Sequence, residues 1–288
     1  MLRTNSHNAN RLPHLRLAKM LCVAIAMFSL QAFAANQTLT AGIEPGFPPF
    51  SYQQQGTAKG IAPDIMRAVA KDQGLNIKFV ALPFPSLIPA LAAGKLQIIA
   101  DGLSVTAQRA KRIDYTLPWI ESNDVIVAPK KSKKNVFTAV CCGAKLGIQG
   151  GSSQEGWVNT HLKNSGMKIN LKDYSNYVTI VTDMLSGRVD AADLPETTAL
   201  QFINKGQPIK ILGKIYIHNP VAFAVKKGDP HKLLAKLNKG LVDVYKSGEL
   251  AKIVHKYIPG LPVPSVPPAN LPNWVNTYKA PIPGIGNQ

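Results

Sequence analysis

Residues 101–118 combine groups that bind anions within one short stretch. Gly102 and Ser104 follow an apolar strand, and Arg109 stands in the first turn of a short predicted helix. Backbone N–H groups at a helix start carry partial positive charge, and a planar guanidinium donates paired hydrogen bonds to a carboxylate. A helix capped by Thr106 with a solvated basic face would explain the same residues. The stretch alone therefore leaves both interpretations open.

Alternating strand and helix patterns surround this stretch and predict a parallel sheet in an α/β fold. Hydrophobic periodicity indicates the helices, and short apolar runs indicate the strands. Strands are predicted at 39–43, 76–82, 95–100, 145–149, 169–173, 189–193 and 209–212. Helices are predicted at 60–74, 85–93, 178–186, 196–204 and 231–256, with another beginning near Ser152.

Two extended apolar runs, 124–128 and 221–225, separate the predicted elements into two sets. They predict two α/β lobes joined by a two-stranded hinge. One lobe would comprise 35–123 together with 220–258, and the other would comprise 124–219. Lobes connected in this way close on whatever binds between them.

The first 34 residues predict a secretory signal peptide. They contain basic residues and no acid, then the apolar run Met20–Leu30, then Ala32-Phe33-Ala34. The apolar run is too short to span a bilayer. We expect cleavage after Ala34 and a soluble protein exported to the periplasm.

The net charge of +17 gives no clear indication of a partner. Lysines are spread along the chain, with one dense run at 130–134, and no zinc finger, basic zipper or RNA-binding signature is present. Export also argues against a role with nucleic acid. We therefore treat the charge as a surface property with an unknown partner.

The cysteine pair and the C-terminal segment support weaker predictions. Cys141 and Cys142 could form a vicinal disulfide, but we expect two small buried apolar residues. The proline-rich segment 259–288 cannot continue a helix and is expected to run over the surface in extended form.

Seven short segments occur in an order that resembles one known family. They are 39–42, 47–52, 60–65, 87–91 with Gly94-Lys95, the 101–118 stretch, 147–155 and 186–191. Each is weak alone, but in this order they resemble the periplasmic solute-binding proteins of polar amino-acid ABC importers, the type II two-lobed members of solute-binding family 3. The resemblance covers about 38–260.

The resemblance implies a site for the α-carboxylate of a ligand. Arg109 matches the arginine that pairs with this carboxylate, and Ser104 and the Gly102 backbone complete its surroundings. Ser152 and Ser153, at the start of a helix in the second lobe, match residues that reach the carboxylate when the lobes close. One of these two serines is expected to be a plain N-cap.

The remaining matched positions concern the rest of the ligand. Phe47 and Phe84 match aromatic residues that sandwich its side chain, although both could instead belong to the core. An aspartate that pairs with the α-ammonium in these relatives is replaced by Pro195 in an ungapped alignment. Asp193 or Glu196 could take its place after a small loop shift; otherwise the ligand is not a standard α-amino acid.

Two acids favour a ligand with a cationic group. Glu44 matches a position where binders of basic amino acids have an acid that faces the side chain of the ligand. Asp101 replaces a small hydroxyl residue. A buried charge needs a partner, so these acids favour a zwitterionic or cationic ligand unless they stay solvated at the mouth of the cleft.

The resemblance implies a binding protein that delivers an amino-acid-like solute to an ABC transporter permease and performs no chemistry. We expect a monomer with no cofactor, no metal and no catalytic residue. The alternative is an exported enzyme similar to cyclohexadienyl dehydratases, with Glu196 as the acid. The sequence contains no other catalytic motif, and its histidines lack the spacing of metal ligands.

Overall fold

The computed structural model describes residues 38–261 and residue 263, apart from the side chains of 215–219. From Leu39 onward the described residues belong to one compact unit. The predicted signal peptide at 1–34 lies outside the described residues, as does nearly all of the proline-rich tail. None of the described helices is long and apolar enough to span a bilayer.

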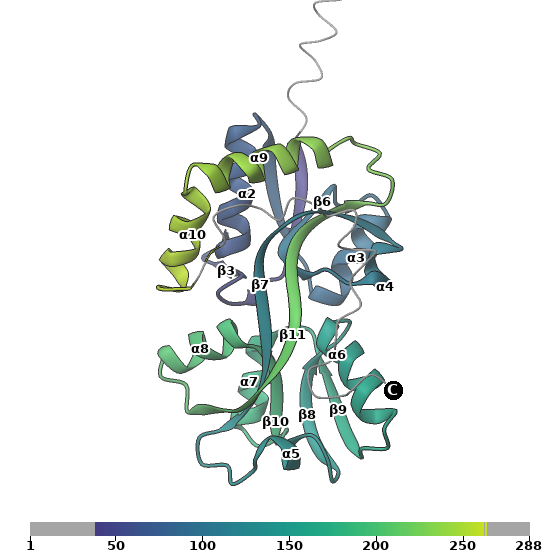
Figure 1. The fold of residues 1–288 in the computed structure, drawn as a ribbon, viewed down its shortest axis with the longest axis vertical. Helices are drawn as coiled ribbons and strands as arrows, with labels where there is room; N and C mark the ends of the chain where they lie inside the picture. The colour runs from purple at the N-terminus through teal and green to yellow at the C-terminus, as the bar shows by residue number, and fades with distance from the viewer. Residues whose placement is uncertain (1–37, 262, 264–288) are drawn as a thin grey trace, which may run out of the picture. The chain divides into compact units, whose positions relative to one another are not determined.

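An eight-stranded mixed sheet forms the framework of the described chain (Figure 1). Its order is β5-β1-β6-β11-β7-β10-β8-β9. The strands are β1 (Thr38–Ile43), β5 (Asn76–Ala81), β6 (Ile98–Ser104), β7 (Ile113–Pro129), β8 (Ala144–Gln149), β9 (Ile169–Tyr174), β10 (Ala191–Pro195) and β11 (Ile209–Lys226). The pairs β1–β6, β8–β9 and β8–β10 are parallel, as the alternation of strands and helices predicted.

The long strands β7 and β11 connect the two halves of the sheet (Figure 1). They pair antiparallel, with register shifts, from Ile113 opposite Lys226 to Pro129 opposite Ile209. On one side β11 pairs with β6, and on the other β7 pairs with β10. Both predicted apolar crossings lie within these two strands, which confirms an α/β fold of two lobes joined by two strands.

Helices cover both faces of each half of the sheet. They are α2 (Ile61–Asp72), α3 (Phe84–Ala92), α4 (Ala107–Ala110), α5 (Val136–Ala139), α6 (Ser153–Trp157), the π-helix η2 (Val158–Lys163), α7 (Tyr177–Leu185), α8 (Glu196–Asn204), α9 (Leu234–Lys246) and α10 (Glu249–Tyr257). Most helices were predicted within a few residues. The single helix predicted at 231–256 is instead two helices, because Gly248 adopts a left-handed conformation with φ 73° and ends α9.

A small antiparallel sheet follows β1 and was not predicted. It consists of β2 (Gly46–Phe47), β3 (Ser51–Gln54) and β4 (Thr57–Lys59). A two-residue strand such as β2 is too short to show a periodic pattern in the sequence. This sheet buries the rings of Phe47 and Phe50.

Strand β6 extends beyond its predicted end. The strand was predicted to end at residue 100, but it continues to Ser104 because its last residues pair antiparallel with Val221 and Ala222 of β11. Gly102 serves packing here, since a Cβ atom at this position would lie 2.4 Å from Cε1 of Phe47. The glycine therefore marks a close approach of a ring to the backbone.

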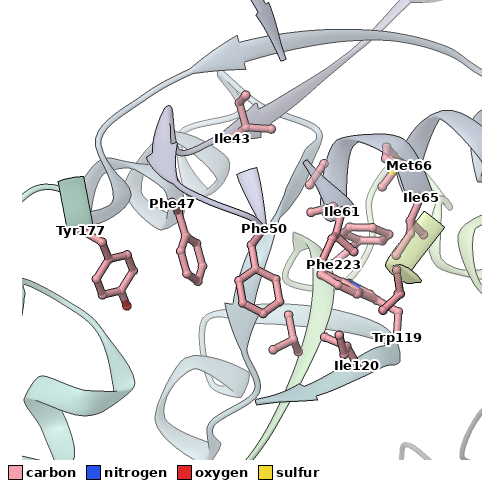
Figure 2. Close-up of a cluster of buried hydrophobic side chains, with 14 of the residues drawn as sticks. Ile43, Phe47, Phe50, Ile61, Ile65, Met66, Trp119, Ile120, Tyr177 and Phe223 are labelled. Carbon is pink, nitrogen blue, oxygen red and sulfur yellow. The ribbon is translucent and has the colours of Figure 1, made fainter. Parts of the chain in front are cut away.

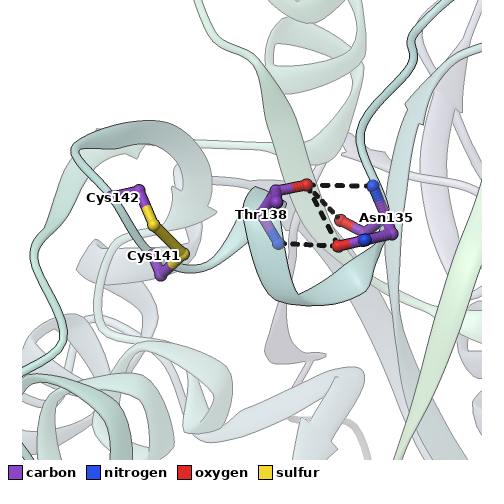
Figure 3. The surroundings of a disulfide bond; sticks show 4 residues. All are labelled: Asn135, Thr138, Cys141 and Cys142. Atoms are coloured by element: carbon purple, nitrogen blue, oxygen red, sulfur yellow. Dashed lines mark hydrogen bonds between the residues drawn. A yellow bond between two sulfur atoms is a disulfide. The ribbon is translucent and has the colours of Figure 1, made fainter.

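A disulfide joins Cys141 to Cys142 in the turn between α5 and β8 (Figure 3). The expectation of two small buried apolar residues is wrong, because the cysteines are bonded and only Cys141 is buried. Cys142 is exposed and has a left-handed φ of 60°. Nearby, α5 begins with a capping box between Asn135 and Thr138 (Figure 3).

Candidate functional site

The guanidinium of Arg109 connects the two halves of the described chain. Thr106 caps α4 by accepting a hydrogen bond from the Arg109 N–H at 3.2 Å. Nη1 donates to the Ser104 carbonyl at 2.9 Å, and Nη2 donates to the Gly151 carbonyl at 2.8 Å. The side chain is buried. The helix is therefore capped by Thr106, but Arg109 is buried and does not belong to a solvated basic face, and the anion site stays a prediction.

Hydroxyl groups from both halves meet beside Arg109. Oγ of Ser153 donates to Oγ of Ser104 at 3.1 Å. Ser152 caps α6 by accepting a hydrogen bond from the Glu155 N–H at 3.1 Å. Ser152 therefore acts as the plain N-cap, and Ser153 is the serine that reaches the other half.

The two predicted aromatic residues contact different partners. Phe47 lies in a row with Phe50 and Tyr177, and its ring centroid is 4.8 Å from each of theirs (Figure 2). Phe84 lies instead against Arg109, whose Cζ is 5.4 Å from the ring centroid. Phe47 and Phe84 are buried, so each of them packs and also lies beside the candidate site.

A cavity of about 10 Å³ lies among these groups, which is close to the space that one water molecule needs. Its walls are formed by Phe47, Phe50, Phe84, Gly102, Ser104, Arg109, Ser122, Gln149, Ser152, Ser153, Gln154, Tyr177, Pro195 and Val221. A groove of about 610 Å³ opens beside it. Phe84, Arg109, Ser152 and Ser153 line both spaces, so the groove and the cavity share one wall.

The carboxylate of Asp101 holds the loop that follows β1. Oδ1 accepts hydrogen bonds from the Gly102 N–H at 2.8 Å and from the Ser51 hydroxyl, and Oδ2 accepts one from the Glu44 N–H at 3.1 Å. Burial raises the pKa of Asp101 to about 6, and these hydrogen bonds oppose the rise. Asp101 does not line the cavity. Its hydrogen bonds indicate that it orients the loop.

Glu44 is fully buried behind the cavity wall. Its Oε2 accepts a hydrogen bond from Gln149 Nε2 at 2.8 Å, but Oε1 has no partner among the described residues. Burial raises the pKa of Glu44 well above its usual range, and the charge of Asp101 adds to this rise. A buried carboxylate with a free oxygen suits a cationic partner.

Asp193 and Asp124 lie on the paired strands β10 and β7, and both are fully buried. Asp124 Oδ1 accepts a hydrogen bond from Gln154 Nε2 at 2.8 Å. The other three carboxylate oxygens have no partner among the described residues. Burial raises the pKa of Asp124 to about 7, and burial together with the charge of Asp124 raises the pKa of Asp193.

Glu196 lies in a different environment from Asp193. Its Oε1 is 2.5 Å from Lys214 Nζ, and the carboxylate side chain is partly exposed. Pro195 lines the cavity, whereas Glu196 does not. Of the two acids considered as replacements for an aspartate at position 195, only Asp193 is buried.

The sequence analysis missed several polar residues beside the cavity, among them Asp124, Gln149, Gln154 and Tyr177. Asp124 gave a signal, because an acid at the start of an apolar run is unusual. Gln149, Gln154 and Tyr177 come from β8, α6 and α7 and become neighbours only in the folded chain. Within the described part of the chain, no group of three histidine, cysteine or acidic side chains is placed to hold a metal ion.

Most of this chain matches one known protein family. Residues 39–260 match the model of the bacterial extracellular solute-binding proteins, family 3. The histidine-binding periplasmic protein of Salmonella typhimurium is 30% identical over 256 residues, which cover 84% of this chain and 96% of that protein.

Solved structures agree with this match. An ancestral arginine-binding protein bound to arginine has a TM-score of 0.72 and 31% identity, with 78% of this chain and 99% of that chain covered. An ancestral amino-acid-binding protein, a precursor of cyclohexadienyl dehydratase, has a TM-score of 0.69 and 25% identity, with 80% and 98% covered.

The buried acids predict a pH dependence of stability. The pKa of about 7 for Asp124 in the folded protein lies above its ordinary value of 3.8, so stability is highest at acidic pH, where the group is protonated in both states, and falls as pH rises from 3.8 to about 7. Relative to Asp124→Asn, the free energy of unfolding of the wild type should fall by about 4 kcal/mol between acidic and mildly alkaline pH. Urea denaturation of both proteins across this range measures the difference. A constant difference would contradict the assignment.

Proposed function

We propose that this chain, which belongs to family 3 of the bacterial extracellular solute-binding proteins, captures an amino acid between its two lobes. The ligand in this proposal is a basic or zwitterionic amino acid or a close derivative. In this proposal the protein is exported by the signal peptide at 1–34, is cleaved after Ala34 and acts as a monomer. It then delivers its ligand to the permease of an ABC importer.

The main support for the proposal is the guanidinium of Arg109, which points into the protein. Its two hydrogen bonds go to carbonyl oxygens, one in each half of the chain, and a ligand carboxylate would be a stronger acceptor for the same N–H groups. Ser104 and Ser153 lie beside it and can donate to the same carboxylate. This arrangement supports a carboxylate site that both lobes complete.

The free oxygen of Glu44 supports a cationic group at the other end of the ligand. Glu44 lies on the loop after β1, and its Oε2 accepts a hydrogen bond from Gln149 of β8. Phe47 and Tyr177 provide apolar surface nearby for the stem of a side chain. The relatives whose names include arginine or histidine support the same class of ligand.

Binding requires the lobes to separate first, because a cavity of about 10 Å³ cannot hold an amino acid. We propose that 35–123 with 220–258 and 124–219 move as two bodies about β7 and β11. The direct link from Arg109 to Gly151 would open in this motion, and the ligand carboxylate would replace it. The groove beside the cavity would be the route of entry.

We propose binding rather than a dehydratase reaction, because the candidate acid is in the wrong place. Glu196 forms an ion pair with Lys214 and does not line the cavity. A general acid must reach the reacting group through at most one water molecule. Prephenate turnover that is lost in Glu196→Gln would overturn this choice.

Arg109→Ala should weaken binding of any carboxylate ligand at least about 30-fold, because truncating one partner of a buried ion pair leaves the other unpaired. Isothermal titration calorimetry measures the affinity, and thermal denaturation checks that the variant is folded. Lys111→Ala, which removes an exposed cation at the end of the same helix and lines neither the groove nor the cavity, is the matched control and should bind normally. Equal affinities for Arg109→Ala and wild type would place the carboxylate elsewhere.

Glu44→Gln should separate ligands by the charge of their side chains. Arginine and lysine should lose at least about tenfold in affinity because their cation loses an anionic partner, whereas glutamine should change little. A thermal-shift screen of these amino acids on both proteins makes the comparison, with Glu196→Gln as a control acid. Equal losses for glutamine and arginine would mean that Glu44 supports the fold and does not select charge.

A further inference from the structure

Helix α5 of the second lobe presents an aromatic side chain to solvent. Phe137 is 58% exposed, and it is the only aromatic residue among the large apolar side chains that are exposed in the described part of the chain. Val136, beside it, is 38% exposed. Exposing an apolar ring to water costs free energy, so a ring that is held in this position is a candidate contact for a partner.

Hydrogen bonds and packing at the start of α5 fix the position of Phe137. In the capping box, Asn135 Oδ1 accepts a hydrogen bond from the Thr138 N–H at 2.9 Å (Figure 3). Val136 packs on β11, where a Cβ atom on Gly213 would lie 3.1 Å from Cγ2 of Val136. The helix is therefore anchored at its first turn, and the fold itself exposes the ring.

Four lysines precede α5 on the loop 130–134, and hydrogen bonds hold this loop against the start of β11. The Lys130 N–H donates to the Pro208 carbonyl at 2.7 Å, and Lys210 Nζ donates to the Ser132 carbonyl at 2.7 Å. None of the four ammonium groups on the loop forms an ion pair with another residue that the structure describes. Their charges are therefore open to a partner from outside the chain.

The chain around this loop provides no negative charge to offset the lysines. Residues 130–144 contain four lysines and neither an acid nor an arginine. Lys130 and Lys210 also line a hollow of about 480 Å³, and no acid is among the described residues that line it. We call residues 130–137 the basic surface. Its positive charge suits an anionic partner.

The residue types of the basic surface favour anionic lipid over an acidic protein. Arginine is enriched at protein interfaces, where its planar fork pairs with carboxylates, and lysine is depleted there. Clustered lysines are attracted instead to the diffuse negative charge of an anionic membrane face. An exposed phenylalanine beside them is suited to the boundary between headgroups and acyl chains. The basic surface has lysines and a phenylalanine but no arginine.

We propose that residues 130–137 dock the protein on the face of a membrane that contains anionic phospholipids. The lysines attract the phosphates of the headgroups, and Phe137 enters the layer between them. This inference goes beyond the proposed function, because none of these residues lines the cavity or the groove beside it. It assigns a partner to part of the basic charge whose partner the sequence leaves unknown.

Co-sedimentation with vesicles tests the docking, with the processed protein purified after export from a bacterial host. Wild type should bind vesicles of phosphatidylcholine with one third phosphatidylglycerol at least about tenfold more tightly than vesicles of phosphatidylcholine alone. Raising the salt concentration from about 0.05 M to about 0.5 M should remove most of this binding, because salt screens exposed charges.

Two variants test the basic surface directly. The double variant Lys131→Ala, Lys133→Ala should weaken binding to the phosphatidylglycerol vesicles at least about tenfold, because two lysines no longer face the headgroups. Phe137→Ala should weaken it at least about fivefold, because less apolar surface enters the membrane. All three side chains are exposed, so the fold should survive, and thermal denaturation checks this.

Matched controls distinguish docking from attraction by the net charge of the whole chain. Lys236→Ala with Lys246→Ala removes two exposed lysines from α9 in the first lobe, and Leu200→Ala removes an exposed apolar side chain from α8. Both controls should bind the vesicles as wild type does. Equal losses in the two lysine double variants, or no loss in Phe137→Ala, would mean attraction by net charge alone and would overturn the docking.

The remaining outcomes separate this proposal from the proposed function. A wild type that binds neither kind of vesicle at low salt would overturn the docking and leave an acidic protein as the partner of the basic surface. The affinity for arginine, measured by calorimetry, should be the same in wild type and in every variant. The proposed function fails on a different result, which is a wild type that binds no amino acid while it still binds the vesicles.

Discussion

The burial of carboxylates without cations is the constraint on which the rest of the structure depends. Glu44, Asp101, Asp124 and Asp193 are all fully buried near the junction of the two lobes, although the whole chain has a net charge of +17. Burying an ionised carboxylate costs more free energy than a surface ion pair contributes. The chain has many basic residues, but none of them pairs with these buried acids among the described residues. This pattern is expected when a ligand supplies the cation.

The four acids differ in how many of their carboxylate oxygens accept hydrogen bonds from the protein. Asp101 accepts three hydrogen bonds and orients the loop that carries Glu44 and Phe47, so its role is structural. Glu44, Asp124 and Asp193 keep carboxylate oxygens without a partner among the described residues. Antiparallel pairing of β7 with β11 and with β10 brings these groups together from distant parts of the sequence. The fold thus concentrates negative charge where the lobes meet, with Arg109 facing it.

Sequence periodicity predicted most of the fold, because burial imposes its pattern locally on strands and helices. The two crossings were recognisable as apolar runs, and the order of short motifs predicted Arg109, Ser104 and Ser153 as site residues. The end of β6, the small sheet around Phe47 and the disulfide at Cys141 depend on pairing or close contacts that leave no periodic signal. Asp124 did stand out as an acid at the start of an apolar run, but its place beside the cavity depends on neighbours from α6, α7 and β10 that the sequence does not bring together.

The most direct test of this account is a crystal structure of the protein grown with arginine. We expect the carboxylate within hydrogen-bond distance of Arg109 and Ser153, the guanidinium at Glu44, and the ammonium at Asp193. An arginine bound outside this cavity, or bound in it with its ammonium facing Glu196, would contradict the account.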